Sequence, residues 1–308
     1  MSSRPNPQQS SDADDRYPVT LPTLRARKQA GEPLVMITAY DCPSARVACR
    51  AGVDLVLVGD SGAMTVLGMD STVPVALDEM LVLMRAVRRG LDASSPAPHN
   101  GPLMVGDLPF GSYEISDQQA VGSAMRLVKE AGCDAVKLEG GGPMALSRVR
   151  AIIEAGIPVM GHVGLTPQTA TALGGYRAQG RDAAGAVRIV EEAISLQRLG
   201  CFALVLEAIP SQLTSLLMPR LTETVVIGIG AGPATDGQVL VFHDLLGIRD
   251  GGGGRFVKRY ADLQDAMITG VTAYAEDVRA HRYPAAEHGY KMPADILAEV
   301  RARYPVES

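Results

Sequence analysis

The sequence predicts an α/β fold, a closed TIM-type (βα)8 barrel of parallel strands. Short apolar runs alternate with segments of helical periodicity along most of the 308 residues. Glycines that end a helix, as in Glu-Ala-Gly-Cys at 130–133, come just before the next apolar run. Alternating strands and helices favour right-handed βαβ units around a parallel sheet. Eight such repeats favour a closed barrel over an open sheet.

The expected strands are short runs rich in Val, Leu and Met with almost no polar residue. Such runs are typical of strands that are buried on both faces. We expect them at 34–39, 54–59, 103–106, 135–138, 158–161, 203–206, 225–229 and 240–242.

The expected helices lie between these runs. Segment 183–199 carries apolar residues at the three- and four-residue spacing of an amphipathic helix. The other helices between the strands are expected at 42–51, 77–89, 118–131, 144–155 and 213–221, and two later ones at 261–280 and 294–303.

Three parts of the chain are expected from composition. Residues 1–19, rich in Pro, Ser, Asp and Gln, predict a disordered tail without the apolar stretch of a secretory signal. Residues 20–290 would form the single barrel domain, and 291–308 a C-terminal extension.

Composition also excludes several function classes. The net charge of −5 provides no basic field for nucleic acid or an anionic membrane. No apolar run approaches the roughly 18 residues of a transmembrane helix. The four cysteines lack CxxC spacing, so they are expected to be reduced packing residues in a cytoplasmic protein: Cys42, Cys49, Cys133 and Cys201.

Four acidic residues carry the strongest functional signal. Each comes just after an apolar run, and they are Asp60, Asp107, Glu139 and Glu207. The carboxyl ends of parallel strands form the edge of the fold where ligands and chemistry collect. Four carboxylates at that edge predict an enzyme with a metal and acid–base site.

The individual roles have competing interpretations. Asp60 and Asp107 suit Mg²⁺, which takes oxygen ligands, although Asp after a strand also caps turns. Lys137 alternates with Glu139, so both would face the barrel interior and bind an anionic substrate or form a plain buried ion pair. His162 would either line the site or be a structural hydrogen-bonding residue.

Two further residues complete the predicted site. Glu207 is flanked by apolar residues and would be poorly solvated, which suits a general base. Ser61 follows Asp60 and adds a hydroxyl and an N–H group that could hold a carboxylate.

The tract GIGAG (228–232) lacks the spacing of a dinucleotide loop, so close backbone packing at the barrel rim is expected, with a passing ligand as the alternative.

Several long motifs, in order, closely resemble the ketopantoate hydroxymethyltransferase family. The likeness extends from about residue 20 to about residue 290. Two departures, Gly62-Ala63 after the Asp-Ser pair and Met69 where the family often has His, affect the loop after the second strand. The motifs are VGDSGAMTVLGMDST (58–72), GDLPFGSY (106–113), VKLEGG (136–141), GHVGLTPQ (161–168), GGYRAQGR (174–181), LVLEAIP (204–210) and GIGAGPATDGQVLVFHDLLG (228–247).

The resemblance implies a decameric barrel enzyme of pantothenate and coenzyme A biosynthesis. It would transfer a hydroxymethyl group from 5,10-methylenetetrahydrofolate to 3-methyl-2-oxobutanoate, giving ketopantoate. Asp60 and Asp107 would bind Mg²⁺ and, through it, the substrate, with Glu139 close to the metal. The oxo-acid carboxylate would be held by Ser61 and Lys137. His162 would line the site, and Glu207 would be the catalytic base.

Two other functions remain as alternatives. A Mg²⁺-dependent 2-oxo-acid lyase or mutase of the phosphoenolpyruvate mutase/isocitrate lyase type would share the acids, but it usually carries a Cys-bearing gate loop such as KKCGH. No such motif follows the fourth or fifth strand. A catalytically silent barrel would have lost Asp60, Asp107, Lys137 or Glu207, and all four are present.

Overall fold

The computed structural model describes residues 18–249, 251 and 253–305. Eight parallel strands close into a barrel in chain order, with β1 paired to both β2 and β8. The predicted barrel is therefore confirmed. The strands are β1 (Leu34–Thr38), β2 (Leu55–Val58), β3 (Leu103–Asp107), β4 (Ala135–Lys137), β5 (Val159–Gly164), β6 (Ala203–Glu207), β7 (Val225–Ile229) and β8 (Gly237–Leu240).

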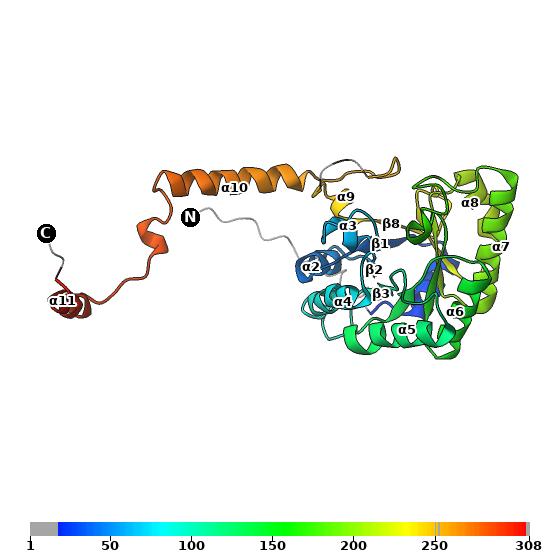
Figure 1. Cartoon of the computed structure of the whole chain (residues 1–308), viewed down its shortest axis with the longest axis horizontal. Helices are drawn as coiled ribbons and strands as arrows, with labels where there is room; N and C mark the ends of the chain where they lie inside the picture. The colour runs from blue at the N-terminus through cyan, green and yellow to red at the C-terminus, as the bar shows by residue number, and fades with distance from the viewer. Residues whose placement is uncertain (1–17, 250, 252, 306–308) are drawn as a thin grey trace. The chain divides into compact units, whose positions relative to one another are not determined.

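Helices surround the strands and cover the barrel (Figure 1). Asp41, Ser116 and Asp182 begin three of them by accepting a backbone N–H from the first turn. Gly132 and Gly200 end two of them in the left-handed conformation. The helices are α2 (Cys42–Arg50), α3 (Gly62–Thr65), α4 (Leu77–Asp92), α5 (Asp117–Ala131), α6 (Pro143–Glu154), α7 (Ala183–Leu199), α8 (Ser211–Leu217) and α9 (Phe242–Leu245), with 3-10 turns at Pro167–Thr169 and Met218–Arg220.

The barrel interior is apolar in its lower layers and charged at its carboxyl end. Alternate strand residues point inward, so β3 buries Leu103 and Val105 below Asp107, and β6 buries Ala203 and Val205 below Glu207. The period of two that builds the core therefore also aims the strand-end acids into the barrel mouth.

Helix α1 (Leu21–Ala30) packs at the opposite end of the barrel. Its one buried residue, Leu24, belongs to the interior apolar cluster. Thr20 caps its start and Gly31 ends it in the left-handed conformation. This helix was not expected from the sequence, because a helix with one buried residue has no apolar stripe to detect.

The expected eighth strand at 240–242 is wrong, because β8 spans Gly237–Leu240 and Phe242 already belongs to α9. Pairing fixes this position, since Gly237 lies opposite Leu34 of β1 and Ile227 of β7. A Cβ at Gly237 would lie 2.5 Å from the Leu34 carbonyl oxygen, so glycine permits this approach. The apolar run that suggested a strand instead begins the next helix.

The chain divides into two compact units, one ending at Tyr260 and one beginning at Ala261. The second unit contains α10 (Leu263–Arg279), a 3-10 turn (Ala286–His288) and α11 (Ala294–Arg303), and α10 has no buried residue. Within the described residues, no helix is long and apolar enough to cross a membrane. Most of the expected tail at 1–19 lies outside the described residues, and the expected boundary at 290 stays a prediction.

The four cysteines carry free thiols, as expected. Three of them are buried, namely Cys49, Cys133 and Cys201, and burial raises the pKa of Cys201 to about 12. The thiol of Cys201 therefore stays protonated at neutral pH, and the three buried cysteines act as packing residues.

Candidate active site

All seven site residues predicted from the sequence line one cavity of about 200 Å³ at the carboxyl end of the barrel. Asp107, Lys137 and Glu207 are the last residues of β3, β4 and β6, and His162 lies within β5. The other three follow their strands by two or three positions, and they are Asp60, Ser61 and Glu139.

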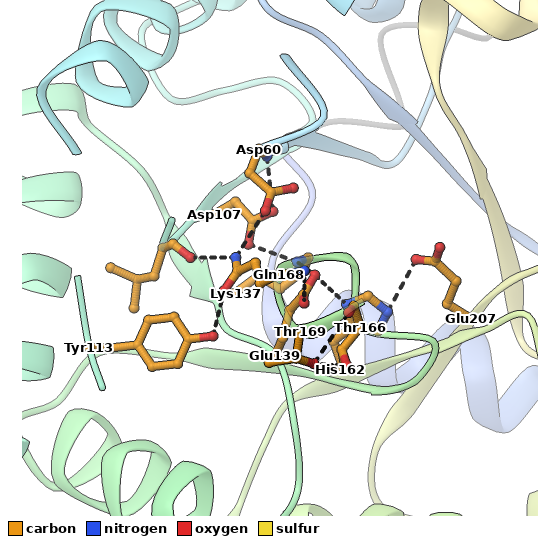
Figure 2. A network of polar contacts seen from close by, with 11 residues as sticks. Asp60, Asp107, Tyr113, Lys137, Glu139, His162, Thr166, Gln168, Thr169 and Glu207 are labelled. Carbon is orange, nitrogen blue, oxygen red and sulfur yellow. Dashed lines mark hydrogen bonds and ion pairs between the residues drawn. The ribbon is translucent and has the colours of Figure 1, made fainter. Parts of the chain in front are cut away.

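One side of the cavity is formed by Asp60, Asp107 and Lys137 (Figure 2). Nζ of Lys137 donates to Oδ1 of Asp107 over 2.7 Å, and the backbone N–H of Asp60 donates to Oδ2 of Asp107 over 3.1 Å. All three residues are buried. The lysine expected to meet an anion therefore lies beside a carboxylate, as a buried lysine requires.

The other side is a chain of three charged groups across β4, β5 and β6. Nδ1 of His162 lies 3.4 Å from Oε1 of Glu139, and Nε2 lies 3.2 Å from Oε2 of Glu207. Neither contact has the angles of a hydrogen bond, so both are ion pairs. Lys137 approaches the same Glu139 oxygen at 3.8 Å, and this joins the two sides of the cavity.

Burial and neighbouring charges perturb the pKa of most of these groups. Burial, followed by repulsion from Asp107 and Glu139, raises the pKa of Asp60 well above its usual value. Burial also raises the pKa of Asp107 despite the nearby lysine. For His162, burial alone would lower the pKa, but the two glutamates raise it to about 9, so the imidazole is protonated at neutral pH.

Lys137 and Glu139 are held in their charged forms. Burial opposes the charge of Lys137, but Asp107, Glu139 and Asp60 raise the pKa of the amine above its usual value. Burial likewise opposes the charge of Glu139, while His162, the lysine and a backbone N–H together lower the pKa of that carboxyl. The two residues can therefore act as fixed charges in the site.

The ionised site has an excess of negative charge. Four carboxylates face two cations, Lys137 and His162, which leaves two negative charges uncompensated. Among the described residues, no three His, Cys, Asp or Glu side chains converge as a ligand cluster. A magnesium ion often uses only one or two carboxylates together with water and substrate oxygens. The pair Asp60 and Asp107, with its unfavourable mutual repulsion, fits this donor set.

Ser61 lies at the cavity edge, where its Oγ is 2.8 Å from the Tyr40 hydroxyl. Burial raises the pKa of Tyr40 to about 12, so the phenol is neutral. A neutral hydroxyl pair of this kind can donate to a bound carboxylate.

Gln168 and Tyr113 also belong to the site, and neither was assigned a role from the sequence. The Gln168 amide donates to Oδ2 of Asp60 over 2.9 Å, and the Tyr113 hydroxyl donates to Oε1 of Gln168 over 2.6 Å. Both residues lie within the family motifs named above, and both are polar residues in the rim loops after β3 and β5. Their position in these loops, close to the carboxyl ends of the strands, is the sequence feature that could have indicated a role in the site.

A second cavity of about 1020 Å³ adjoins the first and shares Glu207 with it. Its walls come mainly from the loops after β5, β6, β7 and β8, with Met64 of α3. Cationic residues Arg177, Arg249 and Arg255 lie along it. The expected close packing at GIGAG is present, since a Cβ at Gly230 would lie 2.7 Å from the ring of Phe256. A ligand passing over this tract stays a prediction, and Gly230 and Gly232 line the cavity where it would lie.

Comparison with known families gives a match over nearly the whole barrel. Residues 18–286 match the family described as ketopantoate hydroxymethyltransferase. A protein of Moorella thermoacetica called 3-methyl-2-oxobutanoate hydroxymethyltransferase is 51% identical, covering 90% of this chain and 99% of its own. A relative in Arabidopsis thaliana, 3-methyl-2-oxobutanoate hydroxymethyltransferase 1, mitochondrial, is 47% identical over 91% of this chain and 80% of its own.

Solved structures with related barrels are more distant in sequence. A phosphoenolpyruvate phosphomutase from Streptomyces platensis subsp. rosaceus has a TM-score of 0.54 at 14% identity, covering 91% of this chain and 99% of that one. A phosphonopyruvate hydrolase complex with oxalate and Mg²⁺ has a TM-score of 0.53 at 14% identity, covering 92% and 98%. These likenesses support the fold alone.

The lyase or mutase alternative therefore has a shared fold in its favour, whereas the transferase has extensive sequence identity. The expected activity, 3-methyl-2-oxobutanoate hydroxymethyltransferase in pantothenate biosynthesis, agrees with the family match and with the relatives. The one-carbon donor of that family is 5,10-methylenetetrahydrofolate. The chain belongs to the ketopantoate hydroxymethyltransferase family.

Proposed function

We propose that this chain catalyses its transfer with Glu207 as the base and with Mg²⁺ held by Asp60 and Asp107. The observation that carries the proposal is the convergence of these carboxylates on one small cavity beside Lys137 and His162. Glu139 would lie close to the metal, and its contacts with His162 and Lys137 favour a link through water. When bound, the cation supplies positive charge that stabilises an enolate oxygen.

The oxo-acid substrate would bind between the two sides of the cavity. Lys137 and Ser61 would hold its carboxylate, and the apolar walls Leu57, Val205 and Ile229 would contact its branched carbon end. Glu207 would then remove the C3 proton, a step for which general-base catalysis contributes roughly 10²–10⁴-fold in rate. The protonated His162 beside it forms an ion pair with this carboxylate and holds it in place.

The folate donor would occupy the larger adjoining cavity. This cavity reaches Glu207, so the enolate carbon could attack the methylene carbon of the opened iminium form. The new C–C bond forms as the C=N π bond of the iminium becomes the lone pair of the folate nitrogen. The remaining C–N bond then breaks, and water supplies the hydroxyl oxygen while one of its protons goes to the departing nitrogen. Arg177 and Arg255 on its wall suit the carboxylates of a folate glutamate tail.

Proton exchange tests this assignment without the donor. We expect the C3 proton signal of 3-methyl-2-oxobutanoate to disappear in D₂O when protein and Mg²⁺ are present, and ketopantoate to form once tetrahydrofolate and formaldehyde are added. Glu207→Gln should keep Mg²⁺-dependent binding of the oxo acid yet lose the exchange. Exchange that persists in this variant would show that Glu207 is not the base. Exchange without any divalent cation would show that the metal is not needed for this step.

We also propose that the chain forms a homo-oligomer, with the decamer implied by resemblance as its expected size. Apolar residues of α10 support this, because Ile268, Val271 and Tyr274 are 57%, 68% and 57% exposed. A second copy of the chain would cover them. Val271→Glu should lower the mass measured by light scattering, whereas the control Thr272→Glu on the same helix should not. An unchanged mass in Val271→Glu would contradict the role of this face.

Cytoplasm stays the prediction for this chain, although the Arabidopsis relative is called mitochondrial.

A further inference from the structure

Gln168 is a buried amide whose hydrogen-bonding groups are all used. It lies in the 3-10 turn after β5, with 4% of its surface exposed. Its Oε1 accepts from the Tyr113 hydroxyl over 2.6 Å. Its Nε2 donates to Oδ2 of Asp60 over 2.9 Å and to the carbonyl oxygen of Leu108 over 3.0 Å. Buried polar groups satisfied in this way have a single orientation.

The chemistry of these partners fixes which end of the amide faces Asp60. The Leu108 carbonyl can only accept, so the NH₂ group must point toward it. The same NH₂ group then donates to Asp60, while the amide oxygen meets the one hydroxyl donor, that of Tyr113. Rotation of the amide would break all three bonds at once.

The backbone of Gln168 contacts a second carboxylate of the site. Its N–H donates to Oε2 of Glu139 over 3.0 Å. One residue after β5 thus connects Asp60, which follows β2, with Glu139, which follows β4 (Figure 2). The relative positions of these two acids therefore depend on where this turn lies.

We propose that Gln168 is a positioning residue that fixes Asp60 as a ligand for the divalent cation. By donating to Oδ2, it leaves Oδ1 for the cation, and Oδ1 accepts no hydrogen bond from the residues that the structure describes. The inference rests on the proposed function, because it assumes the cation site at Asp60 and Asp107.

Metal affinity measured without turnover tests the proposal. Groups that hydrogen-bond a metal ligand typically contribute about 10–100-fold to affinity. Gln168→Met keeps the length of the side chain and removes the amide, so the Kd for Mn²⁺, followed by electron paramagnetic resonance on the metal-free full chain, should rise about 10–100-fold. Tyr113→Phe removes only the hydroxyl that orients the amide, and it should raise the Kd by a smaller factor.

Gln197 offers a matched control. Its amide also bridges two segments, donating to the Arg220 carbonyl over 2.9 Å and accepting from the Glu223 N–H over 3.1 Å, but on α7 outside the cavity. Gln197→Met should leave the Kd for Mn²⁺ unchanged. A rise equal to that of Gln168→Met would show general loosening of the barrel and overturn the proposal.

The outcomes separate this proposal from the cation site itself. If wild-type protein binds no Mn²⁺, or if Asp60→Asn leaves binding intact, the cation site in the proposed function fails. If wild type binds and Asp60→Asn does not, yet folded Gln168→Met and Tyr113→Phe keep wild-type affinity, only the positioning role is overturned. Should Gln168→Met not fold by circular dichroism, Tyr113→Phe, which removes a single oxygen atom, decides alone.

Discussion

Nε2 of His162 lies 3.2 Å from Oε2 of Glu207, so the proposed base is paired with a buried imidazole. The other ring nitrogen faces Glu139, and the contacts with the two acids raise the pKa of His162 to about 9. The imidazole therefore places a positive charge beside Glu207, while its ion pair with Glu139 holds the other side of the ring. Its role is more specific than that of a residue that simply lines the cavity.

Replacing His162 should impair the chemical step more than substrate binding. His162→Gln removes the cation beside Glu207 but keeps the base itself, so we expect kcat to fall by roughly tenfold, less than the roughly 10²–10⁴-fold that a general base contributes. The KM for the oxo acid should change less. Steady-state kinetics at saturating Mg²⁺ measures both constants.

A histidine outside the cavity provides the control. His99, whose Nδ1 lies 3.4 Å from Asp134, is remote from the cavity-lining residues, and His99→Gln should keep wild-type kcat. A wild-type kcat in His162→Gln would contradict the pairing of this ring with the base.

Removal of the cation should destabilise the barrel. Without it, Asp60 is buried beside Asp107 and Glu139, and their repulsion acts against folding. A ligand at 100 times its Kd stabilises a protein by about 2.7 kcal/mol, so Mg²⁺ should raise the Tm by several degrees over an EDTA-treated sample. Thermal unfolding followed by circular dichroism measures the difference.

Asp60→Asn should separate the effect of carboxylate repulsion on stability from the effect of cation binding. The metal-free variant should melt above metal-free wild type because one buried charge is gone, and it should lose most of the Mg²⁺-dependent rise. The exposed Asp295 of α11 is the control, and Asp295→Asn should keep the full rise. A normal Mg²⁺ response in Asp60→Asn would remove that residue from the ligand set.

Gly90 of α4 should resist substitution by alanine. A Cβ there would lie 2.5 Å from the Cys42 carbonyl oxygen and 2.7 Å from Cβ of Ala45 in α2. Alanine gains about 1 kcal/mol of helix propensity, but overpacking costs typically about 1–3 kcal/mol. We expect Gly90→Ala to lower the free energy of unfolding measured by urea titration.

Gly122 of α5 is the matched position, since a Cβ added there would meet nothing within 4 Å. Gly122→Ala should raise the free energy of unfolding by up to about 1 kcal/mol. Equal effects of the two substitutions would contradict the close contact between α2 and α4.

Ala208, directly after Glu207, has a φ of 49°, in the left-handed region that disfavours side chains. Ala208→Gly removes this strain while adding freedom to the unfolded chain, so the net change in stability should be within about 1 kcal/mol. Ala208→Val should destabilise by more than about 1 kcal/mol, because β-branched residues avoid this region. Urea titration compares the three proteins, and a fully stable valine variant would refute the strain.

Much of the site follows from sequence periodicity. Lys137 and Glu139 were expected on one face of a strand, and both point into the cavity. Asp107 and Glu207 were found because an apolar run marks the end of a buried strand. These features are local, so the order of residues along one strand is enough to reveal them.

The missed features depend on distant parts of the chain. Gln168 acquires its role from Asp60, 108 residues away, and from Tyr113, 55 residues away. No local pattern records such a contact. The position of β8 likewise depends on pairing with Leu34 of β1, and its alternating burial departs from the continuous apolar run used to find the other strands.

The charged side chains of the site come from β2 to β6, whereas the larger cavity is bounded mainly by the loops after β5 to β8. With the proposed function, chemistry and recognition of the second substrate would occupy neighbouring arcs of one ring that meet at Glu207. Arg177 and Arg255 line the larger cavity and not the smaller one, so substitutions there would alter which donor is accepted without moving a carboxylate of the site. In evolution or in the laboratory, the proposed donor site would thus allow specificity for the one-carbon donor to change while the groups that form the enolate stay in place.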